Sequence, residues 1–565
     1  MHRVEPEALI ADLDADQRAA VTTPSHLVAV IAGAGSGKTR VLTRRVAHRI
    51  ATGEADPQHT LVLTFTREAA GELRRRLRSL GLREHVEAGT FHSVMLGILR
   101  QRWSDGERRP RTVVSDRRRL VRDALAEGGT GAPRQIASAL AEIEWAGARG
   151  LTADAYATEA RRTQRRPTGG VQQAADAIGA YESLKRSRGV IDFDDVLTLV
   201  VSEARRDPEF ADVLRWRFRH VLVDEAQDLN PVQHRLVDLL RHGRDDLFLV
   251  GDPAQAIYGF NGADPRVLTE VETTFPGIEV IRLPVNHRCT PQVVRVAGHA
   301  LGATNQPTNV RSARHDGRAV DMFAAADEND EATRVAQQIV RGDPQLVRSG
   351  QVAVLARTNA QLTGFEQALG DLGAAVRRSA TATGSPLQQA IRLAGERSSP
   401  SALRAWAHDT LDDVDALEMA RARVSAIEAE SAGLRTSTRA RRPAAAERSD
   451  ATLVLAAVEA ERRVATSILE FLRDRPRGDG ADFRSWVATT NPFDDGTTDG
   501  VDLLTFHAAK GREWHTVYVT GVESSLVPHK SATTAAAKAE EARLLYVATT
   551  RASDHLILSS ADRRG

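Results

Sequence analysis

Residues 30–42 read VIAGAGSGKTRVL, an apolar run followed by a glycine cluster, Lys38 and Thr39. We predict a short buried strand over 28–31, a tight turn, and a helix that begins at Thr39. Glycines in such a turn let successive backbone N–H groups point inward at the positive end of a helix, which makes an anion site. Lys38 would then reach the β- and γ-phosphates of a nucleotide, and the Thr39 hydroxyl would bind Mg²⁺.

Two features distinguish this stretch from a glycine-rich turn that arises by chance. Strand, glycines, Lys-Thr and helix follow one another in the order that a P-loop requires. Lysine is also rare in this chain, where nearly every basic residue is arginine. The strict pattern has glycine where Ala32 stands, and a methyl group is small enough to fit there. The residues expected around the phosphates are Ala32, Gly33, Ala34, Gly35, Ser36, Gly37, Lys38 and Thr39.

The composition is that of a globular protein with several domains. A chain of 565 residues is too long for one hydrophobic core, and 42% hydrophobic and 27% charged residues are ordinary values. The single cysteine, Cys289, excludes an intrachain disulfide. The polar, acidic N-terminal segment predicts no signal peptide, and no apolar run is long enough to span a membrane. We therefore expect a cytoplasmic protein.

The net charge of +1 gives no sign of a strongly basic nucleic-acid-binding domain. Any nucleic-acid site would have to be a local groove.

Short β-like runs recur between helical stretches in two sets. They lie at 61–65, 221–225, 247–252 and 278–283, and then at 352–357, 501–506, 516–522 and 555–560. Continuous apolar strands that alternate with helices are typical of parallel sheets covered on both faces, so we predict two α/β domains. Helical segments over 106–184 and 386–499 interrupt them. Within the second, the Arg/Ala/Ser-rich stretch 435–450 is predicted to be a loop or disordered.

Two of the apolar strands end in residues suited to nucleotide chemistry. Asp224 would hold Mg²⁺ through water, and Glu225 would orient and deprotonate the attacking water. Gln255 follows the strand at 247–252, where it would sense the γ-phosphate. By itself, an acid pair at a strand end also fits a solvated pair, and the nearby P-loop favours the catalytic interpretation.

Four further residues have two interpretations each. Tyr258 and Phe260 alternate in a loop where rings could stack on unpaired bases, and their spacing fits core rings equally well. Arg288 and Arg551 each lie in a segment beside the strands of the predicted second domain. Both could reach a triphosphate across an interdomain cleft and stabilise the charge of the transferring phosphoryl group. An isolated arginine is more often a surface residue.

A series of segments in chain order resembles the motifs of the UvrD/PcrA/Rep family of superfamily 1A DNA helicases. The segments are DADQRAAV, AGAGSGKT, TFTREAAGELRRRL, AGTFHSV, IDFDDVL, VDEAQD, GDPAQAIYGFNGADP, VNHRCT, TFHAAKGREWHTVYVTGV and ARLLYVATTRA. The resemblance extends from about residue 13 to 560, with one gap near 386–499.

The resemblance implies two RecA-like P-loop motor domains, each an α/β fold with a helical insertion. The first motor domain would comprise 1–105 and 185–275, with its insertion at 106–184. The second would comprise 276–385 and 500–565, with a reduced insertion at 386–499.

The resemblance also implies a role for individual residues. The catalytic set would be Lys38, Asp224, Glu225, Gln255, Arg288 and Arg551, with Thr39 and Asp224 as metal ligands. The further ATP contacts would be Gln17 to adenine, Arg40, His287 and Glu513, of which Glu513 matches the ribose contact. Single-stranded DNA would contact Phe65, Thr90, His92, Tyr258, Phe260, Asn261 and His507. His287 stands where the family usually has a tyrosine that stacks on adenine.

The function that the resemblance implies is ATP- and Mg²⁺-dependent 3′ to 5′ movement on single-stranded DNA and at its junctions with duplex, in repair or recombination. The location would be a bacterial cytoplasm or nucleoid. No nuclease motif is present, so we expect no cutting of DNA by this chain alone.

Several departures from the family pattern favour a variant of this function. Asn261 replaces a usual arginine, and Trp514 replaces a usual phenylalanine. The insertion at 386–499 is short and lacks a Gly-Ile-Gly turn, and 524–531 lacks the aromatic tip of a strand-separating pin. The chain stops soon after its last motif, which predicts no C-terminal partner-binding extension.

These departures keep three alternatives open. The first is a single-stranded DNA translocase that needs a protein partner to unwind duplex. The second is an ATP-dependent switch that binds DNA and recruits a partner. The third is an RNA-directed enzyme, because stacking does not read the sugar.

Overall fold

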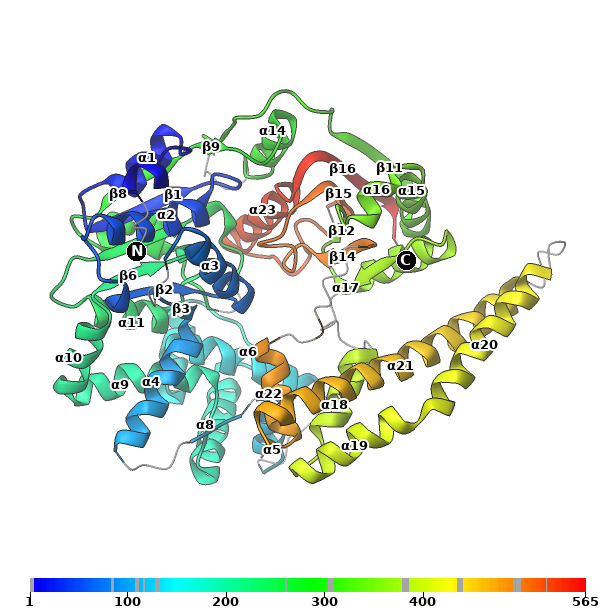
Figure 1. Cartoon of the computed structure of the whole chain (residues 1–565), viewed down its shortest axis with the longest axis horizontal. Coiled ribbons are helices and arrows are strands. Elements are labelled where there is room, and N and C mark those ends of the chain that lie inside the picture. Colours follow the sequence, from blue (N-terminus) through cyan, green and yellow to red (C-terminus); the bar gives the residue numbers. More distant parts are fainter. Residues whose placement is uncertain are drawn as a thin grey trace. The chain divides into compact units, whose positions relative to one another are not determined.

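The apolar runs of the first set form one parallel sheet, as the sequence predicts (Figure 1). In the order of pairing, its strands are β3 (Glu87–Thr90), β2 (Thr60–Thr64), β6 (His220–Val223), β7 (Leu247–Gly251), β1 (Leu27–Ala32) and β8 (Glu279–Leu283). Each strand pairs in parallel with its neighbours. Because β8 pairs with β1 in this sheet, the prediction that the second motor domain begins at residue 276 is wrong for 279–283. The carboxyl ends of β1, β6 and β7 therefore meet at one edge of the sheet, where the P-loop, Asp224 and Gln255 follow them.

The second set forms a second sheet. Its strands, again in pairing order, are β11 (Asp321–Asp327), β16 (Ala552–Arg563), β15 (Trp514–Val519), β12 (Val352–Ala356), β14 (Val501–Thr505) and β13 (Val376–Arg378). β12 pairs in parallel with β14 and β15, and β16 pairs in parallel with β15 and β11. We call the parts of the chain built on these two sheets the first and second domains.

This computed structural model describes most of the chain, which folds into two compact units. The described residues are 5–82, 86–106, 111–114, 117–127, 133–259, 262–302, 309–378, 386–433, 441–476, 478–490, 493, 499–524 and 526–564. One unit is Met1–Val376 with Gly500–Gly565, which contains both sheets, and the other is Arg377–Asp499.

Both faces of the central strands β1, β2, β7 and β12 are buried, which explains why these strands are almost entirely apolar. In β1, Leu27 and Ala29 face one core, and Val28 and Val30 face the other. The helices of the first domain are α1 (Ala15–Thr22), α2 (Lys38–Ala51), α3 (Arg67–Ser79), α4 (Phe91–Asp105), α9 (Phe193–Arg206), α10 (Pro208–Arg217), α11 (Pro231–Arg241), α12 (Arg266–Thr269) and α13 (Val271–Thr274). Those of the second are α14 (Pro291–Ala300), α15 (Glu328–Arg341), α16 (Pro344–Arg348), α17 (Asn359–Asp371) and α23 (Ala535–Thr549).

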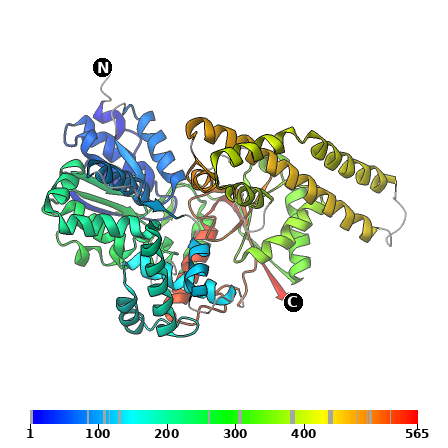
Figure 2. The ribbon, with the colours of Figure 1, turned by 90° about the horizontal axis from the view of Figure 1, so that it is seen from below.

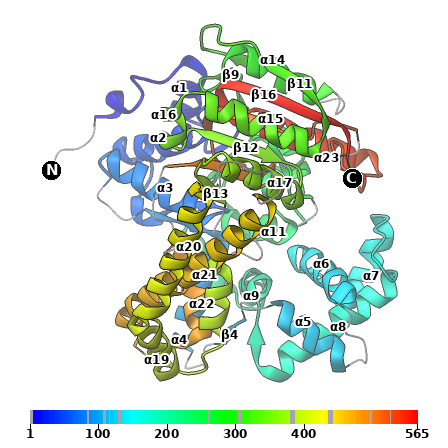
Figure 3. The ribbon, with the colours of Figure 1, turned by 90° about the vertical axis from the view of Figure 1, so that its right-hand side faces the viewer.

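The segment between α4 and α9 is helical, as predicted. It contains α5 (Arg117–Glu127), α6 (Pro133–Arg149), α7 (Ala153–Arg162) and α8 (Val171–Arg188), which gather in one bundle with its own core (Figure 3). Two short strands, β4 (Thr112–Val113) and β5 (Val190–Ile191), pair where the chain enters and leaves the bundle. The bundle is therefore inserted in the first domain at a single place.

The unit Arg377–Asp499 is helical, with α18 (Pro386–Gly395), α19 (Pro400–Asp412), α20 (Val414–Gly433), α21 (Arg441–Asp474) and α22 (Gly480–Thr490). Figure 2 shows α20 and α21 side by side as a long hairpin. The prediction of a loop or disorder at 435–450 is wrong for 441–450, because α21 begins at Arg441. Alanine, arginine and glutamate favour helices, and a helix fixed by buried Val464 and Phe471 extends readily into such a sequence. Residues 435–440 lie outside the described residues.

None of the described helices has both the length and the apolar character that a membrane span needs.

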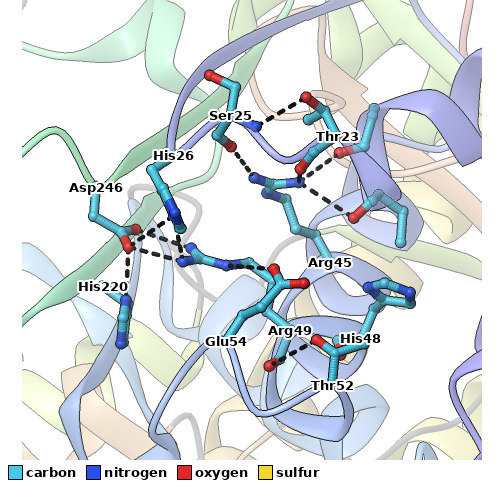
Figure 4. Close-up of polar contacts among 12 residues, drawn as sticks. Thr23, Ser25, His26, Arg45, His48, Arg49, Thr52, Glu54, His220 and Asp246 are labelled. Carbon is cyan, nitrogen blue, oxygen red and sulfur yellow. Dashed lines mark hydrogen bonds and ion pairs between the residues drawn. The ribbon is translucent and has the colours of Figure 1, made fainter.

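A buried ionic cluster secures α2, the helix that follows the P-loop, to the amino ends of the strands (Figure 4). Arg45 donates to the carbonyl oxygens of Ala20, Val21, Thr23 and Ser25. Arg49 donates to both carboxylate oxygens of Asp246, at 2.9 and 2.8 Å. The two arginines thus fix α2 against the end of α1 and the start of β7.

Loss of one partner in this cluster is expected to destabilise the fold strongly. Arg49→Met leaves the buried Asp246 carboxylate without its main counter-ion, which costs about 3–5 kcal/mol of unfolding free energy. Urea denaturation measures the loss. Arg18→Met, at an exposed position on α1, is the matched control and should change stability by less than about 0.5 kcal/mol. Equal effects of the two substitutions would contradict the prediction.

The same cluster gives stability a pH dependence. Burial alone would raise the pKa of Asp246, but hydrogen bonds from Arg49 and His220 hold this pKa well below its ordinary value. The carboxylate therefore stabilises the fold above its unfolded pKa of about 4, and this contribution is lost as pH falls through the lower folded-state pKa. Arg49→Met should accordingly reduce the loss of stability between neutral and acid pH.

Candidate functional site

The P-loop is a turn between β1 and α2. α2 begins at Lys38, one residue before the predicted start, and Gly35 and Gly37 adopt φ of +66° and +83°, a region that favours glycine. Lys38 Nζ donates to the carbonyl oxygens of Ala32 at 3.2 Å and Gly33 at 3.4 Å. The ammonium group therefore lies over the turn, at the N-terminus of α2, where an anion is stabilised.

Gln17 holds the loop from the side of α1. Its Nε2 donates to Ser36 O at 2.9 Å, and a Cβ at Gly37 would lie 2.8 Å from the same nitrogen. Asp14 caps α1 by accepting from the Gln17 backbone N–H at 2.8 Å. The predicted adenine contact is thus buried against the phosphate loop.

The second domain reaches the P-loop directly. His287 N donates to Gly35 O at 2.9 Å, and a Cβ at Gly35 would lie 2.6 Å from Asn286 Oδ1. Ala34 N donates to the Tyr546 hydroxyl of α23 at 3.4 Å. Asn286 and Tyr546 contact the P-loop and were missed by the sequence reasoning, although both stand within quoted motifs that also contain predicted site residues.

Asp224 and Glu225 follow β6, where Asp224 is buried and Glu225 is half-buried. Asp224 N donates to Leu63 O of β2, and Glu225 has φ of +51°, an unusual value for a residue with a side chain. Burial and then the neighbouring Glu225 raise the pKa of Asp224 to about 7. Burial would also raise the pKa of Glu225, but Lys38 and Lys510 hold it below its ordinary value.

This acid pair fits a Mg²⁺ ion bound together with a nucleotide. Two carboxyl groups lie beside one another here, the pKa of Asp224 is raised, and Mg²⁺ prefers oxygen ligands. Among the described residues there is no group of three or more His, Cys, Asp or Glu side chains that would hold a metal ion. A cation held by Thr39 and Asp224 would therefore take its other ligands from phosphate and water.

A chain of hydrogen bonds links Gln255 to Glu225. Gln255 Nε2 donates to Asp252 Oδ2 at 2.7 Å, and Asp252 N donates to Gln227 Oε1 at 2.9 Å. Gln227 Nε2 in turn donates to Glu225 Oε2. These hydrogen bonds connect the candidate γ-phosphate sensor with the candidate base. The sequence reasoning missed the two residues between them, Asp252 and Gln227.

The two predicted arginines lie near each other in the second domain. Arg288 Nε is 2.5 Å from Glu513 Oε2, and Arg288 Cβ would be 2.8 Å from a Cβ at Gly35. Arg551 is 2% exposed and donates to the carbonyl oxygens of Val547 and Arg512. Burial and then Arg288 lower the pKa of Arg551 to about 10. Two cations held close together suit a multiply charged anion.

The other predicted nucleotide contacts lie at the outer end of the site. His287 Nε2 is 2.7 Å from Asp14 Oδ2, which connects the second domain with α1. Arg40 NH2 donates to Asp12 O at 2.9 Å and pairs with the Asp12 carboxylate. Both side chains therefore lie beside the segment that carries Gln17.

Three predicted DNA contacts line one pocket of about 450 Å³ between the first sheet and its inserted bundle. Its lining is Phe65, Arg67, Thr90, His92, Val114, Arg117, Glu144, Phe193 and Asp194. The rings of His92 and Phe193 lie 6.2 Å apart, and burial and then Arg117 lower the pKa of His92 to about 4. Phe193 and the two arginines were missed by the sequence reasoning, although Phe193 stands in the quoted IDFDDVL motif.

Tyr258 and His507 do not line that pocket. Tyr258 is half-buried and packs against the core of the second domain, with Lys510 Nζ 4.9 Å from its ring centre. Burial and then Arg357 lower the pKa of His507 to about 4. The predicted contacts Phe260 and Asn261 lie outside the described residues.

Comparison with known proteins gives a consistent result. Residues 13–276 match the UvrD/REP helicase N-terminal domain, and residues 281–378 and 467–563 match the UvrD-like helicase C-terminal domain. The ATP-dependent DNA helicase UvrD2 of Mycobacterium tuberculosis is 34% identical over 594 residues, which cover 99% of this chain and 80% of that protein. The ATP-dependent DNA helicase PcrA of Staphylococcus epidermidis is 27% identical over 637 residues, covering 99% and 84%.

Proposed function

Since this chain belongs to the UvrD/Rep family of helicases and its two sheets are RecA-like motor domains, we propose that it is an ATP-dependent DNA helicase that moves 3′ to 5′ on single-stranded DNA. One observation carries the proposal. The P-loop contacts residues of both domains, with Gln17 on one side and Asn286, His287 and Tyr546 on the other. A nucleotide bound there would touch both domains, so its hydrolysis would change how they are held together.

The side chains divide the chemistry of ATP hydrolysis between them. Lys38 would bind the β- and γ-phosphates, and Thr39 and Asp224 would hold Mg²⁺, which when bound offsets the phosphate charge. Glu225 would orient the attacking water and take its proton. Arg288 and Arg551 would stabilise charge on the transferring phosphoryl group from the second domain.

The pocket at Phe65 and the ring of Tyr258 would hold bases of the strand. Stacking is worth roughly 1–3 kcal/mol per base, which is strong enough to hold a base and weak enough to release it in each cycle. Contacts to phosphates would make binding salt-dependent and largely independent of sequence. We propose repair or recombination in a bacterial cytoplasm as the setting.

Strand displacement is expected with a 3′ single-stranded tail and not with a 5′ tail. A motor that moves 3′ to 5′ can load on a 3′ tail and run into the duplex. The measurement follows release of a labelled strand with Mg²⁺ and ATP, together with ATP hydrolysis on single-stranded DNA. Lys38→Ala is the control, because it removes the phosphate-binding ammonium group and should abolish both signals. Displacement with only the 5′ tail would contradict the polarity, and absence of ATP hydrolysis would contradict the motor itself.

A second candidate function is a translocase that needs a partner to unwind duplex. It is favoured by the absence of Phe, Tyr and Trp from residues 524–531 and by the reduced unit Arg377–Asp499. ATP hydrolysis that increases with the length of single-stranded DNA, without strand displacement, would support this candidate. Hydrolysis that does not depend on length would instead indicate an ATP-dependent switch, since only a motor gains from a longer track.

A further inference from the structure

Lys510 is a buried lysine of the second domain that reaches into the first. It follows β14 in a helical turn that ends at Gly511, where φ is +85°. Its side chain is 7% exposed, and it is one of only five lysines in a chain that otherwise uses arginine. An ammonium group is compact and offers three donors, so it fits among several close acceptors where the planar guanidinium of arginine would not.

Three groups of the first domain surround this ammonium group. Nζ donates to Asp228 Oδ2 at 2.5 Å and to Gln255 O at 2.8 Å, and it lies 4.9 Å from the centre of the Tyr258 ring. Asp228 is the last acid of the VDEAQD motif. Gln255 is the candidate γ-phosphate sensor, and Tyr258 is a candidate base-stacking residue. The Lys510 side chain thus lies against the acid motif, the candidate γ-phosphate sensor and the candidate base-stacking ring at the same time.

The backbone of residues 255–259 is bonded to the second domain at further points. Arg543 Nε donates to Ala256 O at 2.7 Å, and Gly259 N donates to Glu540 Oε1 at 3.0 Å. The Gln255 side chain, in contrast, stays bonded to Asp252 of the first domain. The segment therefore belongs by sequence to the first domain and is held largely by the second.

Stability alone is a weak reason for the Lys510–Asp228 pair. The Asp228 carboxylate is 4% exposed, and its Oδ1 accepts no hydrogen bond from the described residues. An ion pair that is buried with an unsatisfied oxygen is often no more stabilising than an apolar pair of the same volume. The geometry favours a role that depends on the position of Lys510.

We propose that Lys510 is a positioning residue that couples ATP hydrolysis to the grip on single-stranded DNA. It does so by tying the segment with Gln255 and Tyr258 to the second domain, so that the sensor and the stacking ring move together when the domains separate. The inference rests on the proposed function. It concerns the link between the two sites, while the chemistry at each site is assigned to other residues.

The test measures the factor by which long oligo(dT) stimulates ATP hydrolysis. Lys510→Met keeps the length of the side chain and removes its donors, and it should lower this factor by about 100-fold, the effect of a misplaced catalytic geometry. The loss should appear in kcat and not in the KM for ATP. Lys538→Met removes a lysine from an exposed position on α23 and is the matched control, with an unchanged factor expected.

A double variant separates positioning from stability. Lys510→Met combined with Asp228→Asn removes both charges of this ion pair, so its melting temperature should return toward that of the wild type while stimulation stays low. Recovery of both quantities would overturn the inference, as would normal stimulation in Lys510→Met alone. A wild-type chain without DNA-stimulated hydrolysis would overturn the proposed function and the inference with it.

Discussion

Arg288→Ala is expected to lower kcat for ATP hydrolysis by about 10³-fold, the lower end of the range for a cation that stabilises the phosphoryl-transfer transition state from a second domain. This corresponds to about 4 kcal/mol of transition-state stabilisation. Alanine retains the Cβ that lies close to Gly35, so packing beside the P-loop is preserved. Glu513 loses its ion-pair partner but is 60% exposed, so the fold should lose little stability.

Steady-state hydrolysis with saturating single-stranded DNA measures this effect. Arg282→Ala, at an exposed position on β8, removes the same charge from the neighbouring segment and should leave kcat unchanged. Arg288→Lys should recover only part of the activity, because an ammonium group does not reproduce the planar, bidentate donors of a guanidinium. A kcat for Arg288→Ala within a few-fold of the wild type would exclude Arg288 from phosphoryl transfer.

Glu225→Gln is expected to lower kcat by about 10²–10⁴-fold, the range for loss of a general base. Glutamine has the same shape, and its oxygen can still accept the hydrogen bond from Gln227 Nε2. The variant should therefore bind ATP and still fail to turn it over, with the KM for ATP little changed.

Binding of a fluorescent ATP analogue and single-turnover hydrolysis together test this prediction. Glu209→Gln, at an exposed position on α10, is the isosteric control. If Glu225→Gln lost ATP binding as well as turnover, Glu225 would serve to hold the nucleotide, and another residue would have to act as the base.

Local sequence determined the elements of this protein and the type of its site. The continuous apolar runs and the order of strand, glycines, Lys38 and helix are each contained within a few residues, so the P-loop turn and both parallel sheets could be predicted. Asp224 and Gln255 could be proposed as site residues for the same reason, since each follows an apolar strand within a few residues. Helix formation from Arg441 onward was missed because composition alone does not reveal that α21 continues from a buried helix.

Tertiary structure decided which distant residues meet. The strand order β3-β2-β6-β7-β1-β8 does not follow the order of the chain, so strands far apart in sequence end at one edge. Contact between the two domains brings Asn286 and Tyr546 against the P-loop. It also places Lys510 between Asp228 and Gln255, which strand order brings together. Arg49 and Asp246 both belong to the first domain and meet through its strand order alone. A side chain's neighbours across such distances depend on packing of the whole fold, which no local spacing encodes.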